Sequence, residues 1–197
     1  MPLSRLALTP FAWLSLRYAV VASLLPRCAG AHLRAWSNDL PLSRRANPMT
    51  PRELRSLITS GQRLMGLDVG DKTIGLALSD VRLTIASPLE TIKRSKFRKD
   101  ALAMAEIVKK HEVGGLVLGL PVSMDGSEGP RCQSVRQFAA SLYEILPLPM
   151  AFWDERLSTS AVQRFLTDEA DLSRKRRAEL VDKMAAAYIL QGALDVG

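Results

Sequence analysis

Acidic residues occur at three places in this sequence where apolar neighbours make a charged side chain unusual. Asp68 interrupts an apolar run, Asp154 and Glu155 follow another, and Asp182 borders the apolar stripe of a C-terminal helical pattern. Burying a carboxylate without a partner is costly. We therefore expect these acids to converge on one cleft.

A cluster of carboxylates repels itself unless cations neutralise it. Oxygen ligands without cysteine or histidine favour Mg²⁺ or Mn²⁺ over zinc, and two such ions can support phosphodiester cleavage. The competing interpretation is that these acids only form ion pairs with nearby cations. The candidate pairs join Asp154 or Glu155 to Arg156 or Lys72, and Asp182 to Arg177 or Lys183.

Two basic clusters are candidates for holding a phosphate backbone. Residues 93–99 contain five basic residues, including Lys93, Arg94 and Lys96, and Phe97 among them can stack on a base. Residues 174–177 place four cations, beginning with Arg174 and Lys175, in a first helical turn. There they oppose the helix dipole, which suggests an anionic partner. A solvated surface explains both clusters equally well.

The elements that position these groups follow from local patterns. Thr50 and Glu53 form a capping box that predicts a helix to about residue 59. Residues 64–80 predict a hairpin with a tight turn at 70–72, and residues 82–91 a third antiparallel strand. Buried parallel strands are expected at 116–120 and 150–153, and further helices at 101–111, 131–146, about 160–166 and 174–190. The helix at 101–111 should end at Gly114-Gly115.

The composition fits one α/β domain with an additional segment. Hydrophobic residues make up 47% of the 197 residues, yet no apolar run reaches the roughly 18 residues of a membrane span. The two cysteines, Cys28 and Cys132, do not form a disulfide framework, which favours a reducing compartment.

Residues 1–48 are expected to be a disordered extension outside the fold. They contain six arginines and one acid, a net charge of +5 out of the chain's +7. The charge of the whole chain is therefore weak support for nucleic-acid binding. Four explanations stay open: an organellar transit peptide, a secretory signal, a basic arm, or an upstream start with Met49 as the true beginning.

Five stretches of the sequence resemble the YqgF/RuvX family, which is similar to Holliday-junction resolvases and has an RNase H-like fold. They are GLDVGDKTIGLALSD, ASPLETI, LVLGLPVSMDGSEGPR, WDERLSTSAV and VDKMAAAYILQ, spread over about residues 64–194. The resemblance implies a mixed five-stranded sheet, an antiparallel meander plus two parallel strands, flanked by helices. It places the catalytic, metal-binding acids at Asp68, Glu155 and Asp182, with Asp154 as a supporting ligand, and makes residues 49–197 the nuclease domain.

The same resemblance implies a nuclease that uses Mg²⁺ or Mn²⁺ to process the 5′ end of pre-16S rRNA, with ribosomal particles as further partners. Metal-bound acids would position hydroxide for in-line attack, while Lys72, Arg131, Arg156 and the two basic clusters hold phosphates. Because the motifs look bacterial, we expect a cytoplasmic protein without a membrane partner, or an organellar one if residues 1–48 are a transit peptide. Both a monomer and a homodimer are open.

Three other functions compete with this one. A resolvase of branched DNA is the nearest, and it needs two sites in a symmetric dimer. A non-catalytic nucleic-acid or ribosome-binding module is disfavoured, since acids without metal repel phosphate. GLDVGDKTIG also resembles the phosphate loop of actin-like ATPases, but those proteins need two such domains.

Overall fold

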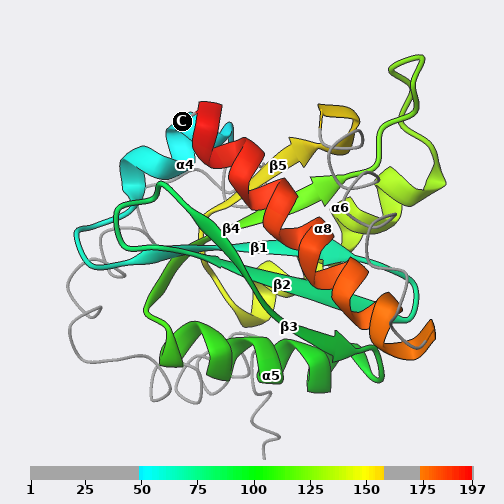
Figure 1. Cartoon of the computed structure of the whole chain (residues 1–197), viewed down its shortest axis with the longest axis horizontal. Helices are drawn as coiled ribbons and strands as arrows, with labels where there is room; N and C mark the ends of the chain where they lie inside the picture. The colour runs from blue at the N-terminus through cyan, green and yellow to red at the C-terminus, as the bar shows by residue number, and fades with distance from the viewer. Residues whose placement is uncertain (1–48, 158–173, 197) are drawn as a thin grey trace, which may run out of the picture. The chain divides into compact units, whose positions relative to one another are not determined.

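The computed structural model describes residues 49–157 and 174–196, with only the backbone described for residues 157 and 174–181. They contain a five-stranded sheet in the order β3-β2-β1-β4-β5 (Figure 1). The strands are β1 Arg63–Val69, β2 Thr73–Ser79, β3 Ala86–Lys93, β4 Val113–Leu120 and β5 Met150–Asp154. The predicted extension 1–48 and the predicted helix at 160–166 lie outside the described residues.

The strand directions confirm the predicted mixed five-stranded sheet. β1 pairs antiparallel with β2, and β2 antiparallel with β3, which makes the predicted meander. β4 pairs parallel with β1, and β5 parallel with β4. Because the central strand β1 has partners of both kinds, its C-terminal end meets the start of β2 and the C-terminal ends of β4 and β5.

Helices cover both faces of this sheet (Figure 1). α8 (Arg174–Val196) crosses one face and packs with the short α4 (Pro51–Leu57) in a core that includes Trp153 and Leu190. α5 (Phe97–Lys110) and α6 (Pro130–Ile145) belong to the core of the other face. A one-turn 3₁₀ helix, η2 (Glu155–Leu157), follows β5 directly. Among the described residues, no helix has the length and apolar character needed to cross a bilayer.

The predicted capping box forms at the start of α4. The Thr50 hydroxyl accepts a hydrogen bond from the Glu53 amide at 3.3 Å, and the Glu53 carboxylate accepts one from the Thr50 amide at 2.8 Å. Two orphan amides at the helix start are thereby satisfied, as the sequence pattern predicts. Met49 forms a parallel bridge to Ala151 just before this helix.

Two predicted boundaries were wrong. β3 begins at Ala86 rather than Arg82, because the Asp80 carboxylate accepts hydrogen bonds from the amides of Thr84 and Ile85 and folds residues 80–85 into a turn. Gly114-Gly115 does not end a helix but lies inside β4. A side chain at Gly115 would collide with Leu54 and Leu64, so the glycine gives α4 room to pack on the sheet.

Two strand glycines let the α8 backbone approach the sheet. A Cβ at Gly66 would lie 2.7 Å from the Ala186 carbonyl oxygen, and one at Gly75 would collide with the Asp182 carbonyl. Gly119, on β4, is close to side chains instead, since a Cβ there would collide with Ile189 and Glu155. A glycine in a strand interior is weakly favoured by itself and often marks such a close approach.

Replacing Gly75 by alanine should therefore destabilise the protein. The new methyl group must displace backbone rather than a flexible side chain, so we expect a loss of about 3 kcal/mol in the free energy of unfolding. Urea denaturation with unchanged slope measures this loss.

Gly129→Ala is the matched control, because no heavy atom lies within 4 Å of a Cβ there. As the N-cap of α6 it should cost at most about 1 kcal/mol. Equal losses in the two variants would contradict the close-approach explanation.

Candidate active site

Asp68 lies on the α8 side of the central strand. It pairs with Gly75 across β1 and β2, and paired residues point to the same face of a sheet. Burial is the main cause that raises the pKa of the Asp68 carboxyl to about 6, and the charge of Asp182 raises it further. The cation Arg131 acts in the opposite direction. The surroundings of the Asp68 carboxyl therefore disfavour its charged form.

Asp182 reaches this position through the packing of α8. Its carbonyl group lies directly over Gly75, the strand partner of Asp68, and its side chain is partly buried. The two acids are therefore neighbours although 113 residues separate them in sequence. Their negative charges repel each other at the C-terminal end of β1.

Glu155 comes from the end of β5. A carboxylate oxygen of Glu155 lies against Gly119, on the sheet face that α8 covers. Burial raises the pKa of Glu155 to about 7, with Asp68 as the next cause and Asp154 as a smaller one, while Arg131 lowers it. Glu155 and Asp182 therefore both interact electrostatically with Asp68.

These three acids have the donor atoms that an oxygen-preferring divalent cation needs. Burial is the main cause of the raised pKa values of Asp68 and Glu155, and the charge of a neighbouring acid adds to it, so a bound cation would stabilise both charged forms. In the described part of the chain, no three side chains of His, Cys, Asp or Glu form a ready-made metal site. The donor chemistry of the three acids fits such a cation.

Asp154 has a different partner from Glu155. Its strand partner Leu120 belongs to the α5 and α6 core, so Asp154 points away from the α8 face. Its carboxylate accepts hydrogen bonds from Arg156 Nε at 3.0 Å and Nη2 at 2.6 Å, and from the Arg156 amide at 3.0 Å. These bonds lower the pKa of Asp154. For this acid, the ion pair that sequence reasoning left open is present.

Arg156 also contacts the loop that follows β4. Its Nη1 donates to the Ser123 carbonyl at 3.5 Å. The guanidinium therefore joins the end of β5 to residues 121–129, the polar loop that precedes α6. We had expected this arginine to hold a phosphate, and the structure shows that it has protein partners.

Arg131 is a cation that acts electrostatically on two of the acids. It lies exposed in the first turn of α6, and its charge lowers the pKa of both Asp68 and Glu155. One guanidinium near three carboxylates leaves net negative charge. Arg131 can thus both steady the acids and reach a phosphate placed beside them.

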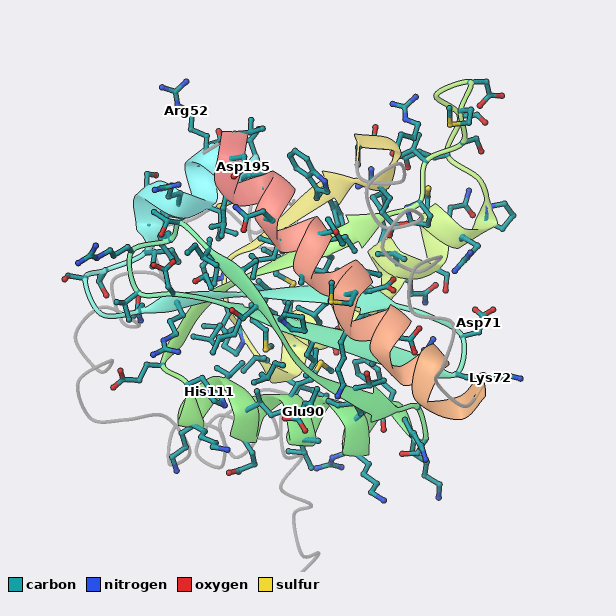
Figure 2. All side chains as sticks on the ribbon, viewed as in Figure 1. Arg52, Asp71, Lys72, Glu90, His111 and Asp195 are labelled. Atoms are coloured by element: carbon teal, nitrogen blue, oxygen red, sulfur yellow. The ribbon has the colours of Figure 1, made fainter. Side chains whose placement is uncertain are left out.

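The other predicted phosphate contacts divide into two groups. Lys72, in the β1–β2 turn, and Lys93 and Lys96 at the end of β3 are exposed at the same end of the sheet as Asp68. Figure 2 shows Asp71 and Lys72 at this end, projecting outward. Arg174 and Lys175 begin α8, but their side chains lie outside the described residues.

Arg94 and Phe97 differ from expectation. Arg94 Nη1 donates to the Gly70 carbonyl at 2.8 Å, and its guanidinium lies 5.7 Å from the centre of the Phe138 ring. Phe97 packs edge-to-face on Phe138, with ring centres 5.6 Å apart, so its partly buried ring lies against the protein core. The pattern of charges alone did not indicate these partners.

Sequence reasoning did not single out the glycines that bring the acids together. Gly75 and Gly119 sit inside apolar strands, in the runs IGLAL and LVLGL. A glycine in such a run is a signal for close backbone approach. That signal was available, but it does not say which element approaches.

Comparison with known proteins identifies relatives over the described fold. The model of the family described as "RuvX: Holliday junction resolvase" matches residues 62–196. A protein of Paramagnetospirillum magneticum named "Putative pre-16S rRNA nuclease" is 66% identical over 147 residues, 75% of this chain and 94% of that protein. A protein of the same name from Methylocella silvestris is 57% identical over 143 residues, 73% of this chain and 88% of that protein.

Among solved structures, T. thermophilus RuvC in complex with a Holliday junction substrate is similar to this chain, with a TM-score of 0.40 and 14% identity. The match covers 65% of this chain and 91% of the RuvC chain. The assignment to a family rests on the sequence relatives and the family match, and not on this solved structure. The family match covers most of the chain, and the two relatives are matched over most of their lengths. The chain belongs to the RuvX family.

Proposed function

We propose that this chain is a metal-dependent nuclease that hydrolyses a phosphodiester bond in the precursor of 16S rRNA. The observation that carries the proposal is the pair of partly buried, mutually repelling carboxylates Asp68 and Glu155, which interact electrostatically with Asp182 and Arg131. Such a cluster is costly for a fold and useful for phosphate chemistry. The names of the relatives support rRNA as the substrate.

Mg²⁺ or Mn²⁺ is the cation that this donor set would take. Asp68, Glu155 and Asp182 would hold it, and when bound it supplies an activated water and stabilises the leaving oxygen. We leave Asp154 out of the ligand set, since its carboxylate is occupied by Arg156.

The chain's own residues have two further tasks in this proposal. Arg131 would bind the scissile phosphate beside the acids, and Lys72, Lys93 and Lys96 would bind flanking phosphates along the same end of the sheet. Because Asp68 and Glu155 must be deprotonated to act as ligands, their raised pKa values set the pH at which the site becomes competent.

Resolution of branched DNA is the second candidate, favoured by the description of the matching family. Cleavage of a junction needs two such sites in a symmetric dimer. For either substrate we place the protein in the cytoplasm, on the bacterial origin of the relatives, with residues 49–197 as the nuclease domain. Ribosomal particles are the partner we propose for the rRNA reaction.

Asp68→Asn should abolish most of the cleavage of precursor 16S rRNA in the presence of Mg²⁺ or Mn²⁺. The amide removes a negative ligand at the centre of the cluster, so we expect kcat to fall roughly a hundredfold or more. Asp71→Asn, an equal charge change on an exposed neighbouring residue, is the control. A folded Asp68→Asn protein that cleaves as fast as the parent would end the proposal.

Stability without metal should decrease as the pH rises from about 4 to about 7. The folded-state pKa values of Asp68 and Glu155, about 6 and about 7, lie above their ordinary values of 3.8 and 4.5. The folded protein thus binds more protons in this window, and its stability is lost as pH rises. Asp68→Asn should reduce this loss, as measured by the melting temperature across the pH series.

Mg²⁺ should raise the melting temperature more at about pH 8 than at about pH 5, because protonated acids bind the ion poorly. This measurement does not depend on cleavage. An equal effect at both pH values would argue against a site made of these acids.

Digestion of precursor 16S rRNA and a four-way DNA junction by the same preparation separates the two candidate substrates. We expect cleavage of the RNA and slower cleavage of the junction. Faster junction cleavage by a dimer would reverse the assignment, and metal-independent binding without cleavage would favour a non-catalytic module.

A further inference from the structure

We propose that Arg94 is a positioning residue that holds the β1–β2 turn and, through it, the backbone that carries Asp68. Its expected effect on catalysis rests on the proposed nuclease function. The structural part of the proposal, the contact between Arg94 and the turn, does not rest on that function. Sequence reasoning had assigned this arginine to phosphate binding, and its contacts support a second role.

Arg94 contacts the turn twice. Its backbone amide donates to the Lys72 carbonyl at 2.9 Å, and its Nη1 donates to the Gly70 carbonyl at 2.8 Å. The turn itself contributes the bond from the Gly70 amide to the Thr73 carbonyl at 3.0 Å. Arg94 therefore satisfies carbonyls at both ends of the three-residue connection, while Asp71 between them is exposed.

The guanidinium is in turn fixed by the core. It lies over the ring of Phe138, which is 6% exposed on α6 and packed against Phe97 at the start of α5. A guanidinium on an aromatic face is attracted to the ring's negative surface. Arg94 thus connects the exposed β1–β2 turn to α5 and α6, the helices on the sheet face opposite α8.

Asp68 depends on this turn because the strand pairing ends close to it. The last pair of the β1–β2 ladder is Val69 with Ile74, one step beyond Asp68 with Gly75. Repulsion from Asp182 and Glu155 acts on the Asp68 carboxylate at this weakly held end. Fraying of the turn would let the strand end move and change the distance between the acids.

The rival role for Arg94 is binding a phosphate of the nucleic acid. Within the described residues, the ion pairs found involve Arg136 and Arg156, and none involves Arg94. Its charge is therefore available to a nucleic acid. The two roles differ in what they require: a phosphate needs the charge, whereas the turn needs the planar, forked geometry.

The test compares Arg94→Lys, which keeps the charge, with Arg94→Ala, which removes it. The Arg94 side chain that these two variants replace is exposed. Lys96→Ala removes a neighbouring exposed cation, and Lys109→Ala in the last turn of α5 is the charge-matched control. The readouts are hydrogen exchange of the Gly70 amide by NMR, kcat and KM on precursor RNA, and the dependence of binding on salt.

A positioning role predicts that both Arg94 variants exchange the Gly70 amide on the order of tenfold faster, since the turn opens more often. It also predicts a fall in kcat of about tenfold in Arg94→Lys with an unchanged salt slope. Lys96→Ala should instead leave Gly70 exchange unchanged and reduce the salt slope by about one. Lys109→Ala should behave like the parent.

Two results would overturn the proposal. Unchanged Gly70 exchange in both Arg94 variants, with a smaller salt slope only in Arg94→Ala, makes the arginine a phosphate contact alone. Faster exchange with parental kcat shows that the turn does not position Asp68. If the parent cleaves no nucleic acid, the proposed function fails and the kcat comparison with it, and Gly70 exchange alone decides the structural part: faster exchange in both Arg94 variants supports it.

Discussion

The direct contact between the α8 backbone and the sheet is the constraint on which the site depends. Side chains at Gly66 and Gly75 would hold the helix away from the strands, and their absence lets carbonyl groups of α8 rest on β1 and β2. Asp182 is thereby placed beside Asp68. A helix that packed one side-chain layer further out would leave the two acids apart, since their charges repel.

The packed cores make this unfavourable electrostatic arrangement tolerable. Each face of the sheet has its own buried apolar cluster, with residues such as Leu67 and Leu118 on one side and Leu190 and Trp153 on the other. Hydrophobic burial of this extent can offset the cost of a few desolvated carboxylates. Arg131 relieves part of the repulsion and leaves negative charge for a cation to neutralise.

We propose two kinds of work for the cations near the site, holding the protein and binding phosphate, and charge alone does not distinguish them. Arg156 bonds to Asp154 and Arg94 bonds to Gly70, so both guanidinium groups fix backbone or acid positions around Asp68 and Glu155. Lys72 and Lys93 instead are exposed at the same edge. The forked geometry of arginine suits the first kind of work, and the flexible lysine suits the second.

The sequence by itself determined the strand that carries Asp68, the capping box at Thr50, and the order of meander and parallel strands, because these depend on local periodicity and turn chemistry. Only the tertiary structure decided that Phe97 packs on Phe138 and that Gly75 lies under Asp182. The physical reason is distance along the chain. Contacts between residues a hundred positions apart are fixed by how helices pack on the sheet, and a local pattern does not contain that information.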